Sequence, residues 1–232
     1  MFLDDIEKKR SKRLKIIESH EKNGVMFEDE FTAYIDESVT IGEGTLIGPC
    51  VTISGDTVIG RNCVIGQNSV IRDSDISDNV QIQSSVITES SVGSGTKVGP
   101  FAYMRPESHV GKDCKVGDFV EIKNSTLGDG SKASHLTYIG DSDVGAGVNL
   151  GCGVVFVNYD GTKKYRSKVE DNAFIGCNSN LVSPVRVGEG AYIAAGSTVT
   201  EDVKGDSLYI ARTKGTEKLG WVSSKGILKR KK

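Results

Sequence analysis

The chain has 232 residues, of which 37% are hydrophobic and only 6% are aromatic, and its formal net charge is −2. This length allows one or two domains, and the composition predicts a core of small aliphatic side chains. The net charge argues against a partner that is bound through many phosphates, and no apolar run is long enough to cross a bilayer. We therefore expect neither a nucleic-acid partner nor a membrane partner.

The N-terminal segment is charged and has no apolar signal-peptide core, so we expect a cytoplasmic protein. Leu3, Ile6, Leu14 and Ile17 recur at loosely helical spacing, and Asn23-Gly24 is a typical helix stop. Residues 1–24 are therefore predicted to form a helical arm.

The five cysteines form no CxxC pair. An odd count without that spacing predicts neither a disulfide framework nor a structural zinc site. We expect small, mostly buried side chains in a reducing compartment.

An aliphatic residue recurs every six positions over most of the chain. One series runs from Ile41 to Ile71, and others resume at Val92, Val144 and Val169, with occasional five-residue steps. A period of six fits neither an α-helix nor an alternating strand. It fits one short strand and one turn per face of a triangular prism, in which three hexads make a coil and residues about eighteen apart stack. The Gly or Asn beside the inward residue is expected to adopt strained turn dihedrals.

This pattern predicts an all-β solenoid over residues 25–203. The [aliphatic]-Gly-x-x-x-x pattern resembles the hexapeptide-repeat family, and the resemblance implies a left-handed parallel β-helix. Residues 204–232 are expected to be a tail, closing in Lys-Arg-Lys-Lys. A polar cap or subunit contact is the main interpretation of this tail, and anion binding is the alternative.

The longest break in the repeat lies between Phe156 and Val169, which are thirteen residues apart. The inserted segment contains a turn signal at Tyr159-Asp160-Gly161 and several basic residues. It is interpreted either as a solvated loop or as a loop that reaches over a binding site.

Stacking places several polar residues side by side. Arg105 and Lys123 are three hexads apart, so together they are predicted to clamp a phosphate. Tyr103, Glu121 and Tyr138 share a second column. A third column holds, in chain order, His135, Cys152, Cys177 and Ala195, whose small side chains predict a groove for an extended ligand.

His135 is the candidate general base among the three histidines, since His20 lies in the arm and His109 at a repeat corner. Histidine side chains titrate near neutrality, which suits removal of a proton from an attacking amine. Three convergent histidine ligands are not available, so no metal site is expected. The Gly-x-Gly pairs arise from the repeat, and no nucleotide-binding fingerprint is predicted.

Residues 99–203, with SHLTYIGD, VNLGCG, VNYDGTKKY and SPVRVGEGAYIAAGSTVT, closely resemble one enzyme family. This is the acetyltransferase half of the bacterial bifunctional N-acetylglucosamine-1-phosphate uridyltransferase/glucosamine-1-phosphate acetyltransferases. The match extends to the arm and to Gly220-Trp221. We expect the uridyltransferase half to be absent from this chain.

The resemblance implies a role for each matching residue. His135 matches the general base and Glu121 an acidic neighbour that supports the site. Arg105, Lys123, Tyr138, Asn149 and Lys164 match residues that bind the sugar phosphate. Acetyl-CoA contacts are implied for the remaining positions, which are Cys152, Asn158, Tyr159, Cys177, Ala195 and Arg212. The family commonly has Ala at position 152 and Ser at position 177, so the two cysteines depart from it.

The predicted function is transfer of acetyl from acetyl-CoA to the amine of glucosamine-1-phosphate, for UDP-N-acetylglucosamine and peptidoglycan precursor synthesis. The resemblance implies a homotrimer with each site between subunits, and acetyl-CoA as cosubstrate without a metal. Two alternatives stay open. One is a different amino sugar phosphate or nucleotide-linked amino sugar as acceptor, and the other is a non-catalytic β-helix scaffold.

Overall fold

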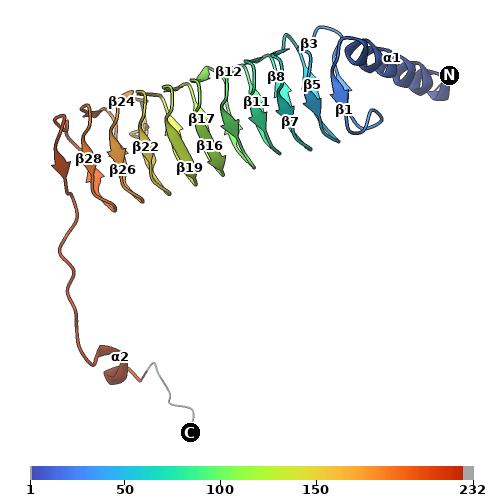
Figure 1. The fold of residues 1–232 in the computed structure, drawn as a ribbon. Helices are drawn as coiled ribbons and strands as arrows, with labels where there is room; N and C mark the ends of the chain where they lie inside the picture. The colour runs from blue at the N-terminus through green and yellow to red at the C-terminus, as the bar shows by residue number, and fades with distance from the viewer. Residues whose placement is uncertain (1, 227–232) are drawn as a thin grey trace.

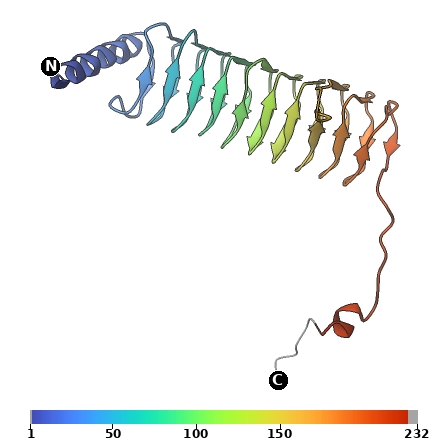
Figure 2. The same cartoon turned by 180° about the vertical axis from the view of Figure 1, so that it is seen from behind.

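The computed structural model describes residues 2–226. The chain winds into a long column of stacked coils, with a helix at its N-terminal end and an extended segment after the last coil (Figure 1). The view from behind shows that the stack is continuous from the first coil to the last (Figure 2). Neither of the helices in this part of the chain is long and apolar enough to cross a lipid bilayer.

Three parallel sheets form the three faces of the column. The 11-stranded sheet, called the first face, consists of β1 (Met26–Phe27), β4 (Leu46–Ile47), β7 (Val64–Ile65), β10 (Gln81–Ile82), β13 (Lys97–Val98), β16 (Lys115–Asp118), β19 (Lys132–His135), β22 (Asn149–Leu150), β25 (Phe174–Ile175), β28 (Tyr192–Ile193) and β30 (Leu208–Tyr209). The 10-stranded second face consists of β2 (Tyr34–Ile35), β5 (Thr52–Ser54), β8 (Val70–Arg72), β11 (Val86–Thr88), β14 (Tyr103–Met104), β17 (Glu121–Lys123), β20 (Tyr138–Gly140), β23 (Val155–Val157), β26 (Asn180–Val182) and β29 (Thr198–Val199). The 9-stranded third face consists of β3 (Thr40–Ile41), β6 (Val58–Ile59), β9 (Asp75–Ile76), β12 (Ser90–Val92), β15 (Ser108–Val110), β18 (Thr126–Leu127), β21 (Ser142–Val144), β24 (Ser167–Val169) and β27 (Arg186–Val187).

Most strands pair in parallel with the strand three positions further along the chain. The chain therefore visits the three faces in turn and rises by one strand spacing per coil, as the six-residue period predicts. The prediction of a parallel β-solenoid with a helical arm is confirmed.

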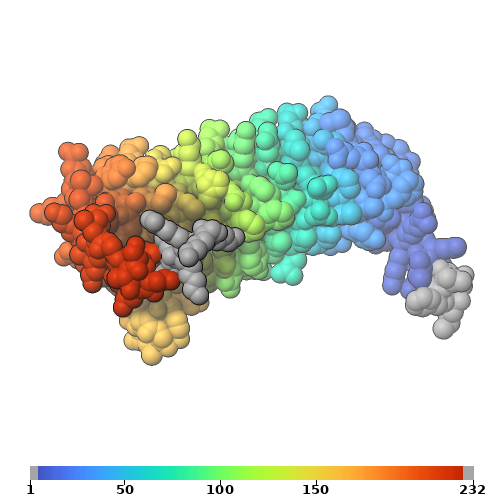
Figure 3. All heavy atoms as spheres, turned by 90° about the horizontal axis from the view of Figure 1, so that it is seen from below, coloured from blue at the N-terminus to red at the C-terminus, as the bar shows by residue number. Residues whose placement is uncertain are grey.

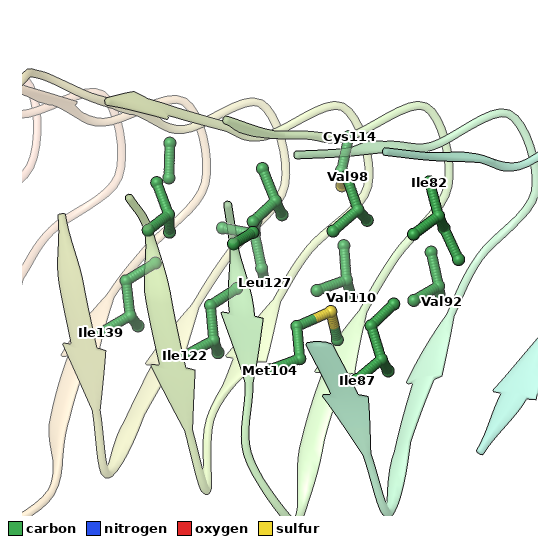
Figure 4. Packing of buried hydrophobic residues seen from close by; sticks show 14 of the residues in the cluster. Ile82, Ile87, Val92, Val98, Met104, Val110, Cys114, Ile122, Leu127 and Ile139 are labelled. Atoms are coloured by element: carbon green, nitrogen blue, oxygen red, sulfur yellow. The ribbon is translucent and has the colours of Figure 1, made fainter. Parts of the chain in front are cut away.

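The hydrophobic core runs along the axis of the column. The repeating aliphatic residue of each hexad points inward, and Ile71, Met104 and Ile122 are fully buried. Figure 4 shows such side chains from the three faces meeting in the interior, among them Ile82, Ile87 and Val92. Each coil contributes only a few aliphatic side chains, so the core is completed by stacking on its neighbours.

Most glycines that directly follow an inward residue do not adopt the strained dihedrals expected of them, Gly99 with a φ of 106° being an exception. Gly42 and Gly60 have no positive φ, but a Cβ on either one would lie 2.6 Å from the backbone of the next coil. Positive φ occurs instead at turn residues such as Asn62 and Asn68, at 55° and 58°. Close stacking of the coils, rather than left-handed backbone, therefore explains the aliphatic-Gly pattern.

Helix α1 (Phe2–Lys22) lies at the open end of the first coils. Its Ile17 is buried in the core cluster and Ile16 packs against it. The helix ends as the sequence indicates, with the N–H of Val25 donating to the His20 carbonyl at 3.1 Å. The arm thus covers apolar surface at the end of the stack, where no further coil is available.

The strand ladder continues beyond the predicted boundary at residue 203. Strand β30 pairs with β28, Leu208 lying opposite Tyr192. An extended segment and the short helix α2 (Trp221–Ser224) follow. The basic cluster Lys-Arg-Lys-Lys at residues 229–232 lies outside the described residues, and the predicted division into arm, β-helix and tail stays a prediction.

Candidate active site

The predicted columns are present on the second face. Tyr103 lies opposite Glu121, which lies opposite Tyr138. Met104 and Ile122 pair in the same ladder, so the residues that follow them, Arg105 and Lys123, are neighbours on adjacent coils. The six-residue register, with the five-residue step between Ile122 and Leu127 taken into account, therefore predicted this arrangement correctly.

Arg105 already has a carboxylate partner. Its Nη1 donates to Oε1 of Glu121 at 2.9 Å, and both side chains are about two-fifths exposed. An exposed pair of this kind contributes little to stability and can be exchanged for a stronger anion. Glu121 was predicted to support the catalytic centre, and its observed contact is with this guanidinium.

Lys123 rests on a carboxylate that the sequence analysis missed. The Nζ atom of Lys123 and the Nδ2 atom of Asn124 each donate to Oδ1 of Asp141 at 2.8 Å. Asn158 donates to the other carboxylate oxygen, Oδ2, at 2.5 Å, and its amide also lies 3.4 Å from the Tyr138 hydroxyl. Asp141 is thus the centre of a network, called here the Asp141 network, that joins two coils to the inserted loop.

The ionisation of Asp141 is set by opposing effects. Its side chain is only 8% exposed, and this burial alone would raise its pKa. The hydrogen bonds from Lys123, Asn124 and Asn158 outweigh burial and hold the pKa below the usual value of an aspartate. The carboxylate therefore fixes the position of the Lys123 ammonium, whose pKa is raised chiefly by the hydrogen bond to Asp141.

The inserted loop brings a third cation, Lys164, close to Lys123 and Arg105. The pKa of Lys164 is lowered, chiefly by the neighbouring Lys123 ammonium and in smaller part by Arg105. The loop is closed by an antiparallel bridge between Tyr159 and Lys164 and by the Asp160 carboxylate, which accepts from the backbone of Thr162 and Lys163. In Figure 3 it protrudes from the column as the gold lobe. Arg105, Lys123 and Lys164 together are called the cation cluster below.

His135 is held by a second carboxylate that was missed. Its Nδ1 atom lies 2.5 Å from Oδ1 of Asp118, its ladder partner across β16 and β19. The hydrogen bond to His135 is the main cause that lowers the pKa of Asp118. Gly117 makes this approach possible, because a Cβ there would collide with the carbonyl of Ser134. An imidazole that is bound through Nδ1 keeps Nε2 as its second ring nitrogen for proton transfer.

The third column continues along the first face from His135. Ala133 pairs with Leu150, Leu150 with Ile175 and Ile175 with Ile193, so the residues two positions later, His135, Cys152, Cys177 and Ala195, lie in one row. At the end of this row Nε of Arg212 donates to the Ala195 carbonyl at 2.9 Å. The row of small side chains between His135 and Arg212, along which the sequence predicts a groove, is called the groove below.

Asn149 and Tyr159 lie apart from the Asp141 network. Asn149 stands on the outer side of the first face, between Lys132 and Phe174 in the ladder. Tyr159 is 55% exposed and donates its hydroxyl to the Gly161 carbonyl at 2.6 Å. Within the described residues neither side chain is hydrogen-bonded to the Asp141 network.

A signal for both missed carboxylates is present in the sequence. The five-residue step between Ile122 and Leu127 shortens one coil to seventeen residues, which is the step that places Glu121 opposite Tyr138. The same step places Asp118 opposite His135. It also brings Asn124 next to Asp141.

No group of three or more His, Cys, Asp and Glu side chains placed to hold a metal ion occurs among the residues that the structure describes.

Comparison with known proteins agrees with the fold. Residues 38–73 and 166–201 match the family described as Bacterial transferase hexapeptide (six repeats). Among solved structures, the UDP-N-acetylglucosamine acyltransferase from Campylobacter jejuni superposes with a TM-score of 0.56 at 19% identity, covering 86% of this chain and 77% of that chain. This structure shares the solenoid fold.

Curated relatives are much closer in sequence. The chain is 54% identical over 220 residues to the Bifunctional protein GlmU of Acetivibrio thermocellus, covering 95% of this chain and 48% of the relative. It is 46% identical over 228 residues to the Bifunctional protein GlmU of Alkaliphilus metalliredigens, covering 98% of this chain and 50% of the relative. The chain thus spans about half the length of the curated relatives it matches, and the resemblance to a bifunctional family is confirmed.

Proposed function

We propose that this hexapeptide-repeat chain, the counterpart of about half of a bifunctional GlmU protein, is a glucosamine-1-phosphate N-acetyltransferase. The observation that carries the proposal is the cation cluster, whose Lys123 is bonded to Asp141 of the coil that also holds His135. Such a site fits a small ligand that has one phosphate and one reactive amine. Acetyl-CoA is proposed as the acetyl donor.

The cation cluster supports a phosphate subsite. Three cations repel one another in the free protein, and Lys164 shows this in its lowered pKa. A bound phosphate would relieve that repulsion, with Arg105 contacting it as a fork and the two ammonium groups as point charges. Glu121, which holds Arg105 in the free protein, would have to share the guanidinium with the phosphate.

His135 is proposed as the general base. Asp118 fixes the ring through Nδ1, so Nε2 is free to take a proton from the amine of the sugar. The amine nitrogen then attacks the acetyl carbonyl, the C–N bond forms, and the C–S bond to CoA breaks. The proton held on His135 can return to the departing thiolate, so the transfer needs no covalent acyl-enzyme.

The groove is proposed to hold the donor. Cys152, Cys177 and Ala195 leave room along several coils, Arg212 lies at the far end, and Asn158 and Tyr159 come from the loop beside it. Backbone N–H groups along this row are suited to stabilise the negative charge that develops on the acetyl oxygen.

A homotrimer with shared sites and a cytoplasmic location belong to the same proposal. Apolar side chains are exposed beside His135, since Phe101, Phe119 and Leu136 are 59%, 58% and 56% exposed. Phe101 and Phe119 stack with their ring centroids 5.6 Å apart. Apolar surface of this kind next to a site is typical of a contact with another subunit.

The test is acetyl transfer measured as thiol release from acetyl-CoA. We expect turnover with glucosamine-1-phosphate and much less with galactosamine-1-phosphate. Turnover with a different amino sugar phosphate or a nucleotide-linked amino sugar alone would replace the acceptor. Failure to bind or consume acetyl-CoA would instead favour a scaffold without catalytic activity.

A further inference from the structure

Two cysteines lie next to each other in the groove. Leu150 and Ile175 are ladder partners, so Cys152 and Cys177, two residues further on, occupy one row in neighbouring coils. Backbone hydrogen bonds fix this register on both sides of the pair. Gly151 N–H donates to the Ile175 carbonyl at 2.8 Å, and Asn178 N–H donates to the Cys152 carbonyl at 2.8 Å.

The spacing of the coils suits a covalent bond between these two residues. Paired strands lie about 4.7–4.9 Å apart, which is within the Cα separation of about 4.4–6.8 Å that disulfides adopt. Gly151 permits the close approach, because a Cβ there would lie 2.6 Å from the backbone nitrogen of Cys177. The Cα separation therefore allows a disulfide, which forms once the two Cβ atoms move closer together than the strand spacing.

The other three cysteines have no such partner. Cys63 and Cys114 are 1% and 3% exposed, and burial raises the pKa of both thiols. Cys50 is exposed, but its neighbour in the next coil is Asn68, because Ile47 pairs with Ile65. In contrast, Cys177 is exposed and Cys152 is half-buried. Accessibility and a neighbouring thiol thus coincide only at Cys152 and Cys177.

We propose that Cys152 and Cys177 are a dithiol that a small disulfide oxidises to an intrachain disulfide, which closes the groove. The Cys177 thiolate attacks one sulfur of the small disulfide, forming a mixed disulfide and releasing one thiol. The Cys152 thiolate then attacks the Cys177 sulfur, the mixed disulfide breaks, and a second thiol leaves. The two cysteines lose two electrons and two protons, and the small disulfide is reduced to two thiols.

The effect on activity rests on the proposed function, because the groove is where the donor is proposed to bind. A disulfide beside His135 would draw the two sulfur atoms together and fix them in one position, which would change the shape of the groove between the base and its far end. Oxidation would then stop acetyl transfer until a reductant reopened the pair.

Mass spectrometry tests the disulfide without any reference to activity. The chain with Cys50→Ser is incubated with glutathione disulfide, so that the exposed single thiol cannot react. We expect a mass loss of two hydrogen atoms, no retained glutathione, and a cross-linked peptide joining residues 152 and 177 after trypsin. Retained glutathione on both cysteines, or no change in mass, would overturn the proposal.

Single substitutions in the same background supply the matched controls. With Cys152→Ser we expect one glutathione retained on Cys177, because no second thiol can displace it. Loss of two hydrogen atoms in this variant or in Cys177→Ser would mean that another pair reacts, which would overturn the assignment.

The activity arm compares the oxidised chain with the same sample after dithiothreitol, following the acetylated sugar by mass. We expect most of the turnover to be lost on oxidation and regained on reduction. A disulfide that leaves turnover unchanged would overturn closure of the groove. Absence of turnover in the reduced chain would contradict the proposed function alone, since the mass result stands apart from it.

Discussion

The coils before Gly99 and those after it have the same core. Ile71 and Ile122 belong to one inward row of the second face, linked through Ile87 and Met104 in successive ladder pairs. All four side chains are fully buried. The interior of the column therefore does not distinguish the part that carries the candidate site from the part that does not.

The outer surfaces of the two regions differ. The earlier coils expose Met26, Phe31, Tyr34 and several valines. The ion pairs within their described residues 25–98 are those of Arg72 with Asp73 and Glu89, at 3.5 and 3.6 Å. The later coils carry a dense set of shorter contacts, which are Arg105–Glu121, Lys123–Asp141, His135–Asp118, Arg166–Asp143 and Arg186–Glu170. The solenoid is a uniform scaffold that sets the spacing of the outward side chains. We infer that function depends on which polar residues point outward from it.

The largest effect is expected at His135. We expect His135→Ala to lower turnover by about 10²–10⁴-fold, the usual contribution of a general base, with little change in the binding of the sugar phosphate. The measurement is steady-state thiol release with both substrates varied. His109→Ala is the control, because His109 is exposed and its ring nitrogen bonds only to Ser91. Equal turnover in the two variants would remove His135 from the mechanism.

Substitution of the core residues should give matched losses of stability in the two regions. Ile71→Ala and Ile122→Ala each delete a fully buried side chain, so each is expected to lower the free energy of unfolding by about 2–5 kcal/mol. Denaturant unfolding followed by circular dichroism measures this. A cost confined to Ile122→Ala would contradict the view that the core is uniform along the column.

The fold was largely predictable from the sequence because a strict period leaves few possible arrangements. Ile41, Ile47 and Ile53 fix the hexad, and one corrected step is enough to place Glu121 opposite Tyr138. The role predicted for the glycines after the inward residues was wrong at positions such as Gly42. A Cβ at Gly42 is excluded by the backbone of the next coil and not by the backbone angle at Gly42 itself. Asp118 and Asp141 were missed because the five-residue step was applied to the column of Glu121 and Tyr138 and was not extended to the acidic residues at the neighbouring turns.

Substitution of Arg105 and of Arg72 compares the outer surface of the later and the earlier coils at equivalent positions of one column. Ser54 lies opposite Arg72 and Arg72 opposite Thr88, and Arg105 follows Thr88 by one coil. Arg105→Ala would remove the proposed charged hydrogen bond to the phosphate, worth about 1.5–3 kcal/mol, and should raise the KM for the sugar phosphate by about 10–100-fold. Arg72→Ala, at the same position two coils earlier, should leave it unchanged. Equal KM values in the two variants would refute the phosphate subsite.

The smallest effect is expected at Asp141, where stability rather than catalysis reports on the network. Asp141→Asn keeps the shape of the side chain but removes the charge under Lys123, and should lower the free energy of unfolding by about 1–3 kcal/mol at neutral pH. Asp143→Asn is the matched control. Asp143 pairs with Arg166 through side chains that are 44% and 42% exposed, so its loss should cost about 0–1 kcal/mol.

The pH dependence gives this comparison a second readout. The pKa of Asp141 is lowered in the folded chain. The contribution of its charge to the free energy of unfolding is therefore fully present above the ordinary aspartate pKa of about 4, and it is lost as the pH falls through the lowered folded pKa. The difference in unfolding free energy between the parent chain and Asp141→Asn should therefore be constant from neutral pH to about 5 and shrink below about 4. Urea unfolding at stepped pH measures it. A difference that persists undiminished in acid would mean that the aspartate acts through packing, and that its charge does not hold Lys123 in place.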